Sequence, residues 1–372
     1  MKKAPIIWTN VILFSSTFLV ATLAVPYYAV TVGFSALEII ALILTMGYCG
    51  ISITAGYHRL WSHKTYDAHP ILQWIFAIGG AFALQNSAIH WSSDHRVHHR
   101  HVDNNEKDPY SAGRGFWYSH IGWMLRDYQG AEYHDYSNVR DLQKNPILAF
   151  QHKYYLALTL VTNIGIPLLL GWLSGNMLGM ILTVGVLRLV LSHHFTFFIN
   201  SLAHIWGTQP YTDQNSARDN GVLAFLTYGE GYHNYHHIFE YDYRNGIRWW
   251  QFDPTKWLIK TCSWLGLTHN LRTVPEERIV LAKAKMQLQR AQAKAQLLPN
   301  AEQLLILLEQ EYQLLLSRMQ DFYQLKKDLM LKQREKLLDQ YHAYDFKLRY
   351  MELKQHFLQQ QTHWRRLTAA LQ

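Results

Sequence analysis

Four stretches of this chain are apolar and long enough to cross a lipid bilayer as helices: residues 8–30, 34–57, 154–173 and 177 to about 199. Glu38 is the only acidic or basic residue in the first two of them. A helix needs about 20 apolar residues to span a hydrocarbon core of about 30 Å, and inside lipid each backbone polar group must be bonded within the protein. The sequence therefore predicts an all-α, multi-pass membrane protein with four transmembrane helices. Because a second apolar run follows the first, a removable signal peptide is the weaker interpretation of residues 8–30.

The Lys and Arg residues predict how these helices are oriented. Residues 58–153 contain ten Lys or Arg residues, whereas the turns at 31–33 and 174–176 contain none. The positive-inside rule then places residues 58–153, both termini and everything after residue 204 in the cytoplasm. The short N-terminus favours a bacterial protein in the inner (plasma) membrane; a eukaryotic protein would lie in the endoplasmic reticulum membrane.

These patterns divide the chain into five parts: a first transmembrane hairpin (1–57), a cytosolic loop or cap (58–153), a second transmembrane hairpin (154–204), a further cytosolic cap (205–275) and a C-terminal helical extension (276–372). Residues 71–89 are uncharged, but a crossing there would separate His58 and His63 from the histidines at 95–101. We expect a re-entrant or surface-lying hairpin instead, for which Gly79-Gly80 and Gln85-Asn86 are suited.

The C-terminal extension differs in character from the rest. No glycine follows Gly266, and an alternating spacing of four and three residues connects Leu308, Tyr312, Leu315, Met319, Phe322 and Leu329, with Lys326 also in the seam. This pattern predicts an amphipathic helix or helical hairpin over 301–372, either structural and self-associating or a membrane-surface or partner-docking arm. Residues 281–372 supply six of the +8 formal net charges, so a nucleic-acid-binding surface on the main body is not expected.

Histidine is over-represented, with 21 residues. Three clusters stand out, namely His58-Arg-Leu-Trp-Ser-His63, His95-Arg-Val-His98-His99 and His233-Asn-Tyr-His236-His237, together with the pair Asn200 and His204. Positions i, i+3 and i+4 share one helical face, whereas His58 and His63 lie about 140° apart on an ideal helix and need a change in backbone direction to meet. We expect hydrogen-bonding or packing roles for His69, His90, His101, His120, His134, His152, His193 and His194.

Crowded imidazoles with no nearby cysteine indicate metal binding, because protonated rings would repel one another. A structural zinc site closes with four ligands and often uses cysteine. About twice that number of histidines converge here, and the chain has only two cysteines, Cys49 and Cys262, so two metal ions are indicated. Imidazole suits iron, copper, nickel and zinc, so the ligands alone do not identify the metal.

The three boxes, their order between two hairpins, the segment Gln85–His95, and Asp108-Pro109 through Gly122-Trp123-Met124 resemble the membrane-bound acyl-CoA desaturases of the stearoyl-CoA delta-9 type. The resemblance covers residues 5–270 and excludes the C-terminal extension. It implies that one iron ion is held by His58, His63, His95, His99 and His236, and another by His98, His204, His233 and His237, with Asn200 reaching the second through water. Asp94, Asp103, Asp108 and Glu230 are expected to orient ligating rings.

The resemblance also implies the reaction, in which O2 and two electrons convert two adjacent methylenes of a saturated acyl-CoA into a cis double bond, with release of two waters. Thr196 and Phe197 are expected near the bend of an apolar substrate tunnel, and Asn86, Asp94 and Arg126 at coenzyme A. Ser93 and Asp127 stand where the animal relatives have basic residues, so acyl carrier protein or a phospholipid remains an alternative carrier. The chain has no flavin, iron–sulfur or haem motif, so an external donor is implied: a ferredoxin or flavodoxin-type reductase, or a b-type cytochrome.

Two other functions remain open. A fatty acid or alkane hydroxylase of the same histidine-box superfamily would share the metals and membrane plan but insert oxygen. A histidine-rich metal transporter would place its ligands near the middle of the spans, whereas the boxes here flank them.

Overall fold

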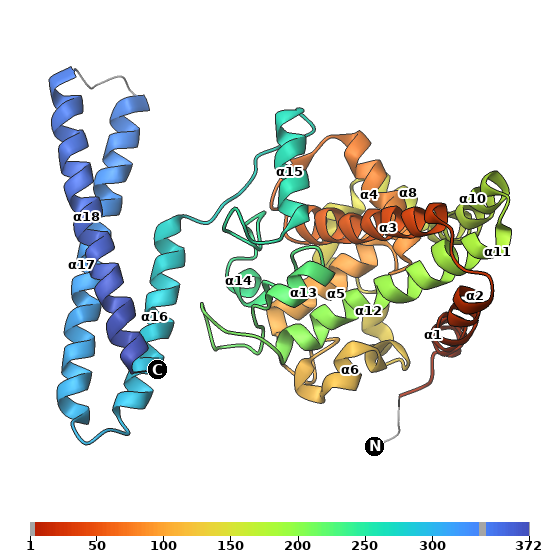
Figure 1. Ribbon diagram of the computed structural model, residues 1–372, viewed down its shortest axis with the longest axis horizontal. Helices are drawn as coiled ribbons and strands as arrows, with labels where there is room; N and C mark the ends of the chain where they lie inside the picture. Colours follow the sequence, from red (N-terminus) through yellow and green to blue (C-terminus); the bar gives the residue numbers. More distant parts are fainter. Residues whose placement is uncertain (1–3, 335–339, 372) are drawn as a thin grey trace. The chain divides into compact units, whose positions relative to one another are not determined.

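The computed structural model describes residues 4–334 and 340–371 and is mostly helical, as predicted (Figure 1). Two compact units are present: residues 1–209 with 214–273, and residues 210–213 with 274–372. Among the described residues, the strands are the two-residue pair β1 (Asp67–Ala68) and β2 (Thr268–His269).

The four predicted spans are present as four continuous helices of sufficient length and hydropathy: Trp8–Thr31, Ala36–Ser62, Tyr155–Ser174 and Met177–His204. Each changes winding along its length. In order they comprise α1 (Trp8–Leu19), η1 (Val20–Ala24) and α2 (Val25–Thr31); α3 (Ala36–Ile51) and η2 (Ser52–Ser62); α9 (Tyr155–Leu160), η7 (Val161–Gly165) and α10 (Ile166–Ser174); and α11 (Met177–Met180), η8 (Ile181–Leu187), α12 (Arg188–Asn200) and η9 (Leu202–His204). The chain is therefore an integral membrane protein with four apolar spans.

Charged groups inside the spans have partners, as burial in lipid requires. Glu38 is buried and forms a capping box with Ser35, and its carboxylate also accepts a hydrogen bond from Asn176 Nδ2 at 2.7 Å. Arg188 donates to the carbonyl of Phe82 at 2.7 Å and to Asn163 Oδ1 at 2.8 Å. These contacts join the two hairpins and fix the fourth span against the rest of its unit.

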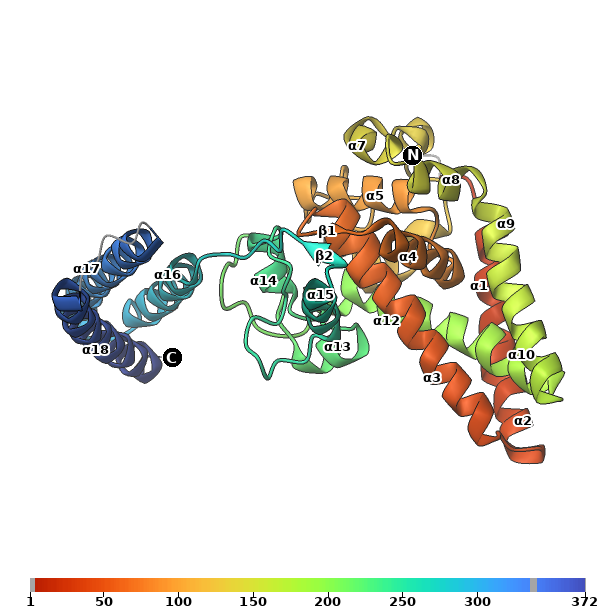
Figure 2. The ribbon, with the colours of Figure 1, turned by 90° about the horizontal axis from the view of Figure 1, so that it is seen from above.

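The remaining helices of the first unit form what we call the cap. Its first part comprises α4 (Pro70–Ala83), α5 (Ala88–His101), η3 (Ala112–Arg114), α6 (Phe116–His120), η4 (Gly122–Met124), η5 (Gly130–His134), η6 (Ser137–Val139), α7 (Arg140–Gln143) and α8 (Pro146–Lys153). Its second part comprises α13 (Gly221–Leu226), α14 (His233–Ile238) and α15 (Pro254–Trp264). Figure 2 shows that α14 and α5, distant in sequence, both lie at the end of the unit opposite the tips of the spans.

Helix α4 has 14 residues, fewer than the about 20 that a helix needs to cross a bilayer, which agrees with the expectation that residues 71–89 do not span it. Of the two predicted turn positions, Gln85-Asn86 is confirmed and Gly79-Gly80 is not. Gly79 and Gly80 sit inside the helix, and the chain reverses after it, where Leu84 and Asn86 adopt positive φ angles of 53° and 72°. A Cβ on Gly80 would overlap the Tyr57 ring, so the glycine allows close packing against η2 rather than a turn.

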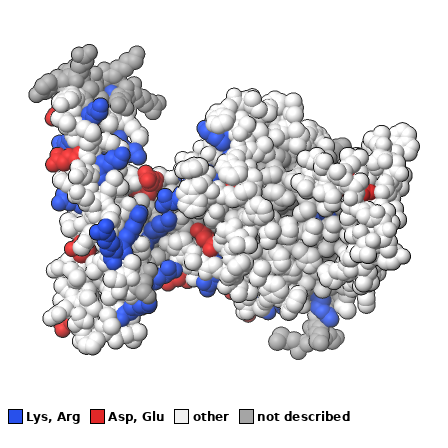
Figure 3. Space-filling view, viewed as in Figure 1, with Lys and Arg blue, Asp and Glu red and all other residues white. Residues whose placement is uncertain are grey.

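The second unit contains α16 (Glu276–Ala295), α17 (Ala301–Arg334) and α18 (Gln340–Ala370). The predicted helical hairpin over 301–372 is present as α17 and α18, which pack together, and α16 adds a third helix. The predicted seam residues Leu308, Leu315, Met319 and Phe322 are buried in its core, and Lys326 lies 3.9 Å from Glu276. Figure 3 shows Lys and Arg side chains gathered on the visible face of this unit, whereas the surface of the spans is nearly free of charge.

Candidate metal centre

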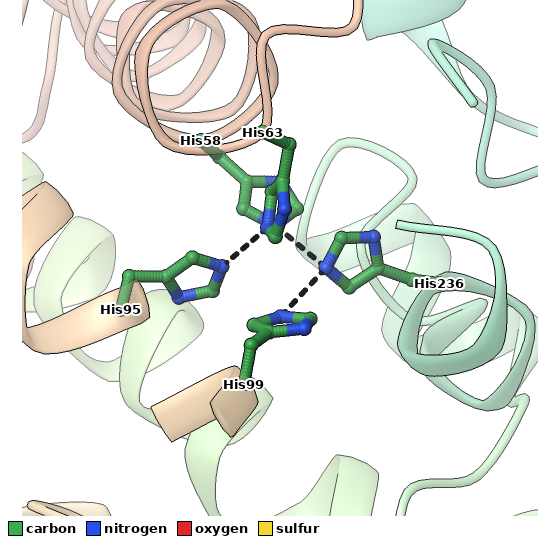
Figure 4. A group of neighbouring side chains, drawn as sticks. All are labelled: His58, His63, His95, His99 and His236. Carbon is green, nitrogen blue, oxygen red and sulfur yellow. Dashed lines mark hydrogen bonds between the residues drawn. The ribbon is translucent and has the colours of Figure 1, made fainter. Parts of the chain in front are cut away.

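Five predicted histidines converge in a first group, drawn in Figure 4: His58, His63, His95, His99 and His236. The Nε2 atoms of His58 and His236 lie 3.0 Å apart, those of His63 and His95 2.8 Å, and those of His236 and His99 3.0 Å. One ring nitrogen from each of the five lies within 4.8 Å of every other. The side chains come from η2 and its C-cap, α5 and α14, so three separate segments build the group.

His58 and His63 meet because the helix that carries them changes its winding. Residues 52–62 form a π-helix, and His63 N donates to His58 O at 3.1 Å, five residues back. This wider helical turn, rather than the expected change in backbone direction, brings the two rings together, with their centroids 4.8 Å apart. Such π segments are frequent at functional sites.

A second group holds His98, His204, His233 and His237. The Nε2 atoms of His237 and His233 lie 3.0 Å apart, those of His233 and His204 3.1 Å, and those of His98 and His237 3.3 Å. All nine predicted ligands are thus brought together, in two groups whose membership matches the predicted division. His58 and His204 lie at the ends of their spans rather than at the middle.

The outer ring nitrogens face oxygen atoms. His58 Nδ1 lies 2.9 Å from Glu230, His98 Nδ1 2.9 Å from Asp108, and His99 Nδ1 3.1 Å from Glu240. His204 Nδ1 lies 2.7 Å from Ser216 Oγ. A carboxylate accepts only, so the neutral form of each facing imidazole carries its proton on Nδ1 and presents a lone pair at Nε2. This is the tautomer that binds metals through Nε2.

Glu230 is itself fixed by a buried network. Its carboxylate accepts from Arg59 Nη2 at 2.9 Å and from Asn245 Nδ2 at 2.6 Å, and Arg59 also pairs with Asp253 at 3.0 Å. Burial raises the pKa of Glu230, but His58 and Arg59 outweigh that effect, so the pKa lies below its usual value. The carboxylate is therefore ionised, and Arg59 and Asn245 hold it in the position where it faces His58.

Burial favours the neutral form of several of these histidines. Burial, reinforced by neighbouring histidines, lowers the pKa well below the usual range for His63, His95, His233, His236 and His237. Burial lowers the pKa of His99 to about 4, although Glu240 partly offsets this effect. Neutral imidazole is the form that a metal ion requires.

The geometry fits bound cations. Pairs of Nε2 lone pairs at about 3 Å would repel without a positive charge between them. Two nitrogens each about 2.1 Å from one metal ion and 90° apart would be separated by about 3.0 Å, close to the separations within both groups. Both groups are thus able to hold metal ions.

A largely apolar pocket of about 320 Å³ reaches the two groups. Leu13, Phe14 and Ile53 contribute apolar wall, and His58, His95, His98 and His233 line the end nearest the metal centre. Asn200 lines the same pocket as His98 and His233 of the second group. The pocket is within the size range of small-molecule sites.

The predicted substrate residues all line this pocket: Asn86, Asp94, Arg126, Thr196 and Phe197. Thr196 Oγ1 accepts from Gln85 at 2.8 Å, and Asn86 Nδ2 donates to Tyr133 at 3.1 Å. Arg126 donates to the carbonyl of Ala4 at 2.7 Å.

Some site residues differ from expectation. Asp94 faces His90 at 3.4 Å and Gln129 at 3.1 Å rather than a member of the two groups. Asp103 acts through Ser216, whose Oγ lies 2.5 Å from it. Glu240 was not foreseen, because it follows the end of α14 and reaches His99 only through the bend there. The N-terminal residues Ile7 and Asn10 also line the pocket. Apart from the hydropathy of their segment, no sequence pattern predicts this role.

The fold and the site together define the class of this protein. It is an integral membrane protein in which nine histidines form two groups, a candidate dimetal centre. The family model for fatty acid desaturases matches residues 35–272. The chain belongs to the fatty acid desaturase family.

Individual relatives extend this result. The chain is 47% identical over 238 residues to a probable acyl-CoA desaturase of Schizosaccharomyces pombe, covering 64% of this chain and 49% of that protein. It is 45% identical to acyl-CoA desaturase 1 of Saccharomyces cerevisiae, covering 62% and 45%, and 34% identical to an sn-2 palmitoyl-lipid 9-desaturase of Nostoc sp., covering 73% and 92%. The chain thus spans about half the length of the two yeast relatives. The expected bacterial origin is not supported by these matches, since both yeast proteins are more similar to the chain than the Nostoc protein is.

Proposed function

We propose that this protein is an acyl-CoA desaturase that introduces a cis double bond into a saturated acyl chain at a di-iron centre. The observation that carries the proposal is that histidines of both groups line one largely apolar pocket. Family membership and the names of the two yeast relatives support the reaction and the acyl-CoA substrate.

Mid-chain methylenes offer no acidic proton and no polar handle, so acid–base side chains cannot begin the reaction. Two iron ions, held by the two groups, would supply the activation of O2 when bound. The net reaction takes two hydrogens from adjacent carbons, two electrons and two protons, and converts O2 to two waters. The protein's own residues hold the metals, exclude bulk water and align one CH2–CH2 unit.

We propose delta-9 regiospecificity, set by the depth and bend of the pocket rather than by hydrogen bonds to the chain. Each methylene contributes only about 1–3 kcal/mol of discrimination in an apolar site. Thr196 and Phe197, which line the pocket, are placed to shape that bend.

Two electrons must come from outside the protein. We propose a ferredoxin or flavodoxin-type reductase, or a b-type cytochrome, as the donor. We also propose that the cap and both ends of the described chain face the cytoplasm, because the cap carries the Lys and Arg residues while the hairpin turns carry none.

A phospholipid-bound acyl chain is a second candidate substrate, favoured by the charge of the pocket. Its lining includes the carboxylates of Asp94 and Asp127, and Arg126, the only Lys or Arg among the lining residues, is bonded to Ala4. The polyanionic headgroup of coenzyme A would meet little positive charge in this pocket. The Nostoc relative, whose name specifies a palmitoyl-lipid substrate, is consistent with this alternative.

The test supplies purified, iron-loaded protein with a reductant system and the same saturated chain on coenzyme A, on acyl carrier protein or in phospholipid vesicles. Desaturated product from acyl-CoA supports the first proposal, whereas turnover only on phospholipid overturns it in favour of the second. Product mass separates desaturation, a loss of two hydrogens, from hydroxylation, a gain of one oxygen. Bound metal that exchanges freely, with no turnover on any carrier, would instead support transport.

A further inference from the structure

Helix α15 exposes an aromatic face that the metal centre does not use. Trp257, Lys260 and Trp264 follow the spacing i, i+3, i+7 and lie along one side of the helix, and Trp264 is 73% exposed. The opposite side, with Ile259 and Cys262, is buried in the core. Large exposed aromatics in a continuous row mark an interaction surface.

Neighbouring segments enlarge this face. Trp249 and Trp250 precede α15 and are 87% and 62% exposed. Phe225 on α13 is 64% exposed and contacts Phe252, with ring centroids 5.0 Å apart, and Phe252 contacts Trp257 at 5.6 Å. We call this combined surface the tryptophan face, comprising Phe225, Trp249, Trp250, Phe252, Trp257 and Trp264.

The charge on the tryptophan face is positive. Arg248 and Lys260 are exposed, and Lys260 Nζ lies 5.9 Å from the centre of the Trp264 ring. The only acidic residue from 247 to 266 is Asp253, which is fully buried and caps α15 by accepting from Lys256 N. Aromatic rings flanked by cations are typical of protein surfaces at the headgroup level of a membrane.

The helices that carry the tryptophan face pack against the ends of two spans. Helix α15 packs against η2, the end of the second span, and α13 packs against α12 of the fourth. At its other end, β2 pairs with β1, and His69 N donates to Leu267 O at 2.8 Å, which ties the end of α15 to the start of α4 (Figure 2). Helix α4 in turn exposes an apolar row: Ile71, Trp74, Ile75 and Ile78.

We propose that the tryptophan face is a second, non-spanning membrane contact, which lies in the headgroup region of the bilayer that holds the four spans and prefers anionic lipid. The anchoring of α15 through η2 fixes the position of this contact relative to His58. The tryptophan face therefore sets the depth at which the pocket and the metal centre meet the bilayer. The proposal depends on membrane insertion of the spans and not on the reaction assigned above.

A fluorescent label at the face tests the proposal. The full-length protein carrying Cys49→Ala and Cys262→Ala receives a single environment-sensitive label through Trp264→Cys, or through Glu106→Cys as the matched exposed control. Each protein is reconstituted into nanodiscs of purely zwitterionic or partly anionic lipid. Quenching by brominated lipid is compared with quenching by aqueous iodide, and metal content and elution volume verify folding.

At position 264 we expect several-fold stronger quenching by brominated lipid than at position 106, weaker quenching by iodide, and a larger blue shift in anionic nanodiscs. Adding Arg248→Glu and Lys260→Glu should remove the preference for anionic lipid. Equal iodide quenching at the two positions would overturn the proposal. So would a label at 264 that becomes shielded only when an electron-donor protein is added, since that result assigns the face to a protein partner.

Discussion

Glu230 Oε2 lies 2.9 Å from His58 Nδ1, and both side chains are almost completely buried. Because Arg59, the next residue along the same helix, holds the same carboxylate, one short segment supplies both a ring and the anchor of its orienting group. Metal binding by the first histidine group therefore depends on Glu230, which is not itself one of the predicted ligands.

Replacing that carboxylate should weaken metal binding without dismantling the fold. We expect Glu230→Gln to lower metal affinity at the first group by about 10–100-fold, because the amide cannot fix the Nδ1 proton as the carboxylate does. Glu240→Gln should have a smaller effect, since Glu240 is 54% exposed and water can replace it. Titration with a competing chelator measures both, with Glu106→Gln as the control. Equal losses in all three variants would contradict the prediction.

Removing one ligand from the four-histidine group should affect that group most. His237→Ala is expected to lower the metal content from about two ions per chain to about one, because three histidines remain around the vacated position. Metal analysis of the purified protein measures the ratio. His269→Ala, at a histidine that is 62% exposed, should retain full metal content.

Acidification should destabilise the metal-free protein. The folded-state pKa values of His63, His95, His233, His236 and His237 are lowered, whereas unfolded histidines titrate near about 6.5. Below that pH the unfolded chain binds protons that the folded chain does not, so the free energy of unfolding falls by up to about 1.4 kcal/mol per pH unit for each such histidine.

We therefore expect a melting temperature in detergent that is nearly constant from about pH 7 to 8 and declines below about pH 6.5. A variant with His95→Gln and His236→Gln should show a shallower decline. A melting temperature that rises on acidification would show that the sign is wrong.

Close packing between α4 and η2 should make Gly80 intolerant of a side chain. A Cβ there would overlap the Tyr57 ring, and Tyr57 is fully buried. We expect Gly80→Ala to lower the free energy of unfolding by about 1–3 kcal/mol. Thermal unfolding in detergent measures the change. Gly47→Ala is the control: a Cβ added at Gly47 would meet no described atom within 4 Å, so the substitution should be neutral or stabilising by up to about 1 kcal/mol.

The spans could be predicted from sequence because a bilayer imposes a length and a hydropathy that few other structures share. The two histidine groups were also predictable, since helical spacing places His95 and His99 on one face and the family resemblance supplied the pairing of distant boxes. The fate of Gly79-Gly80 was not, because glycine serves both tight turns and close helix contacts, and only the packing partner decides between them. Glu240 likewise depends on a bend after Ile238 that no local pattern specifies.

The wider winding of residues 52–62 has a consequence for how this centre is encoded. Deleting a single residue from the early part of that segment would leave every histidine in the chain and would restore an ordinary α-helical repeat. The rings at 58 and 63 would then diverge around the helix axis, and the cluster would open. The number of residues in this helical segment thus determines the site as much as the identity of its ligands does.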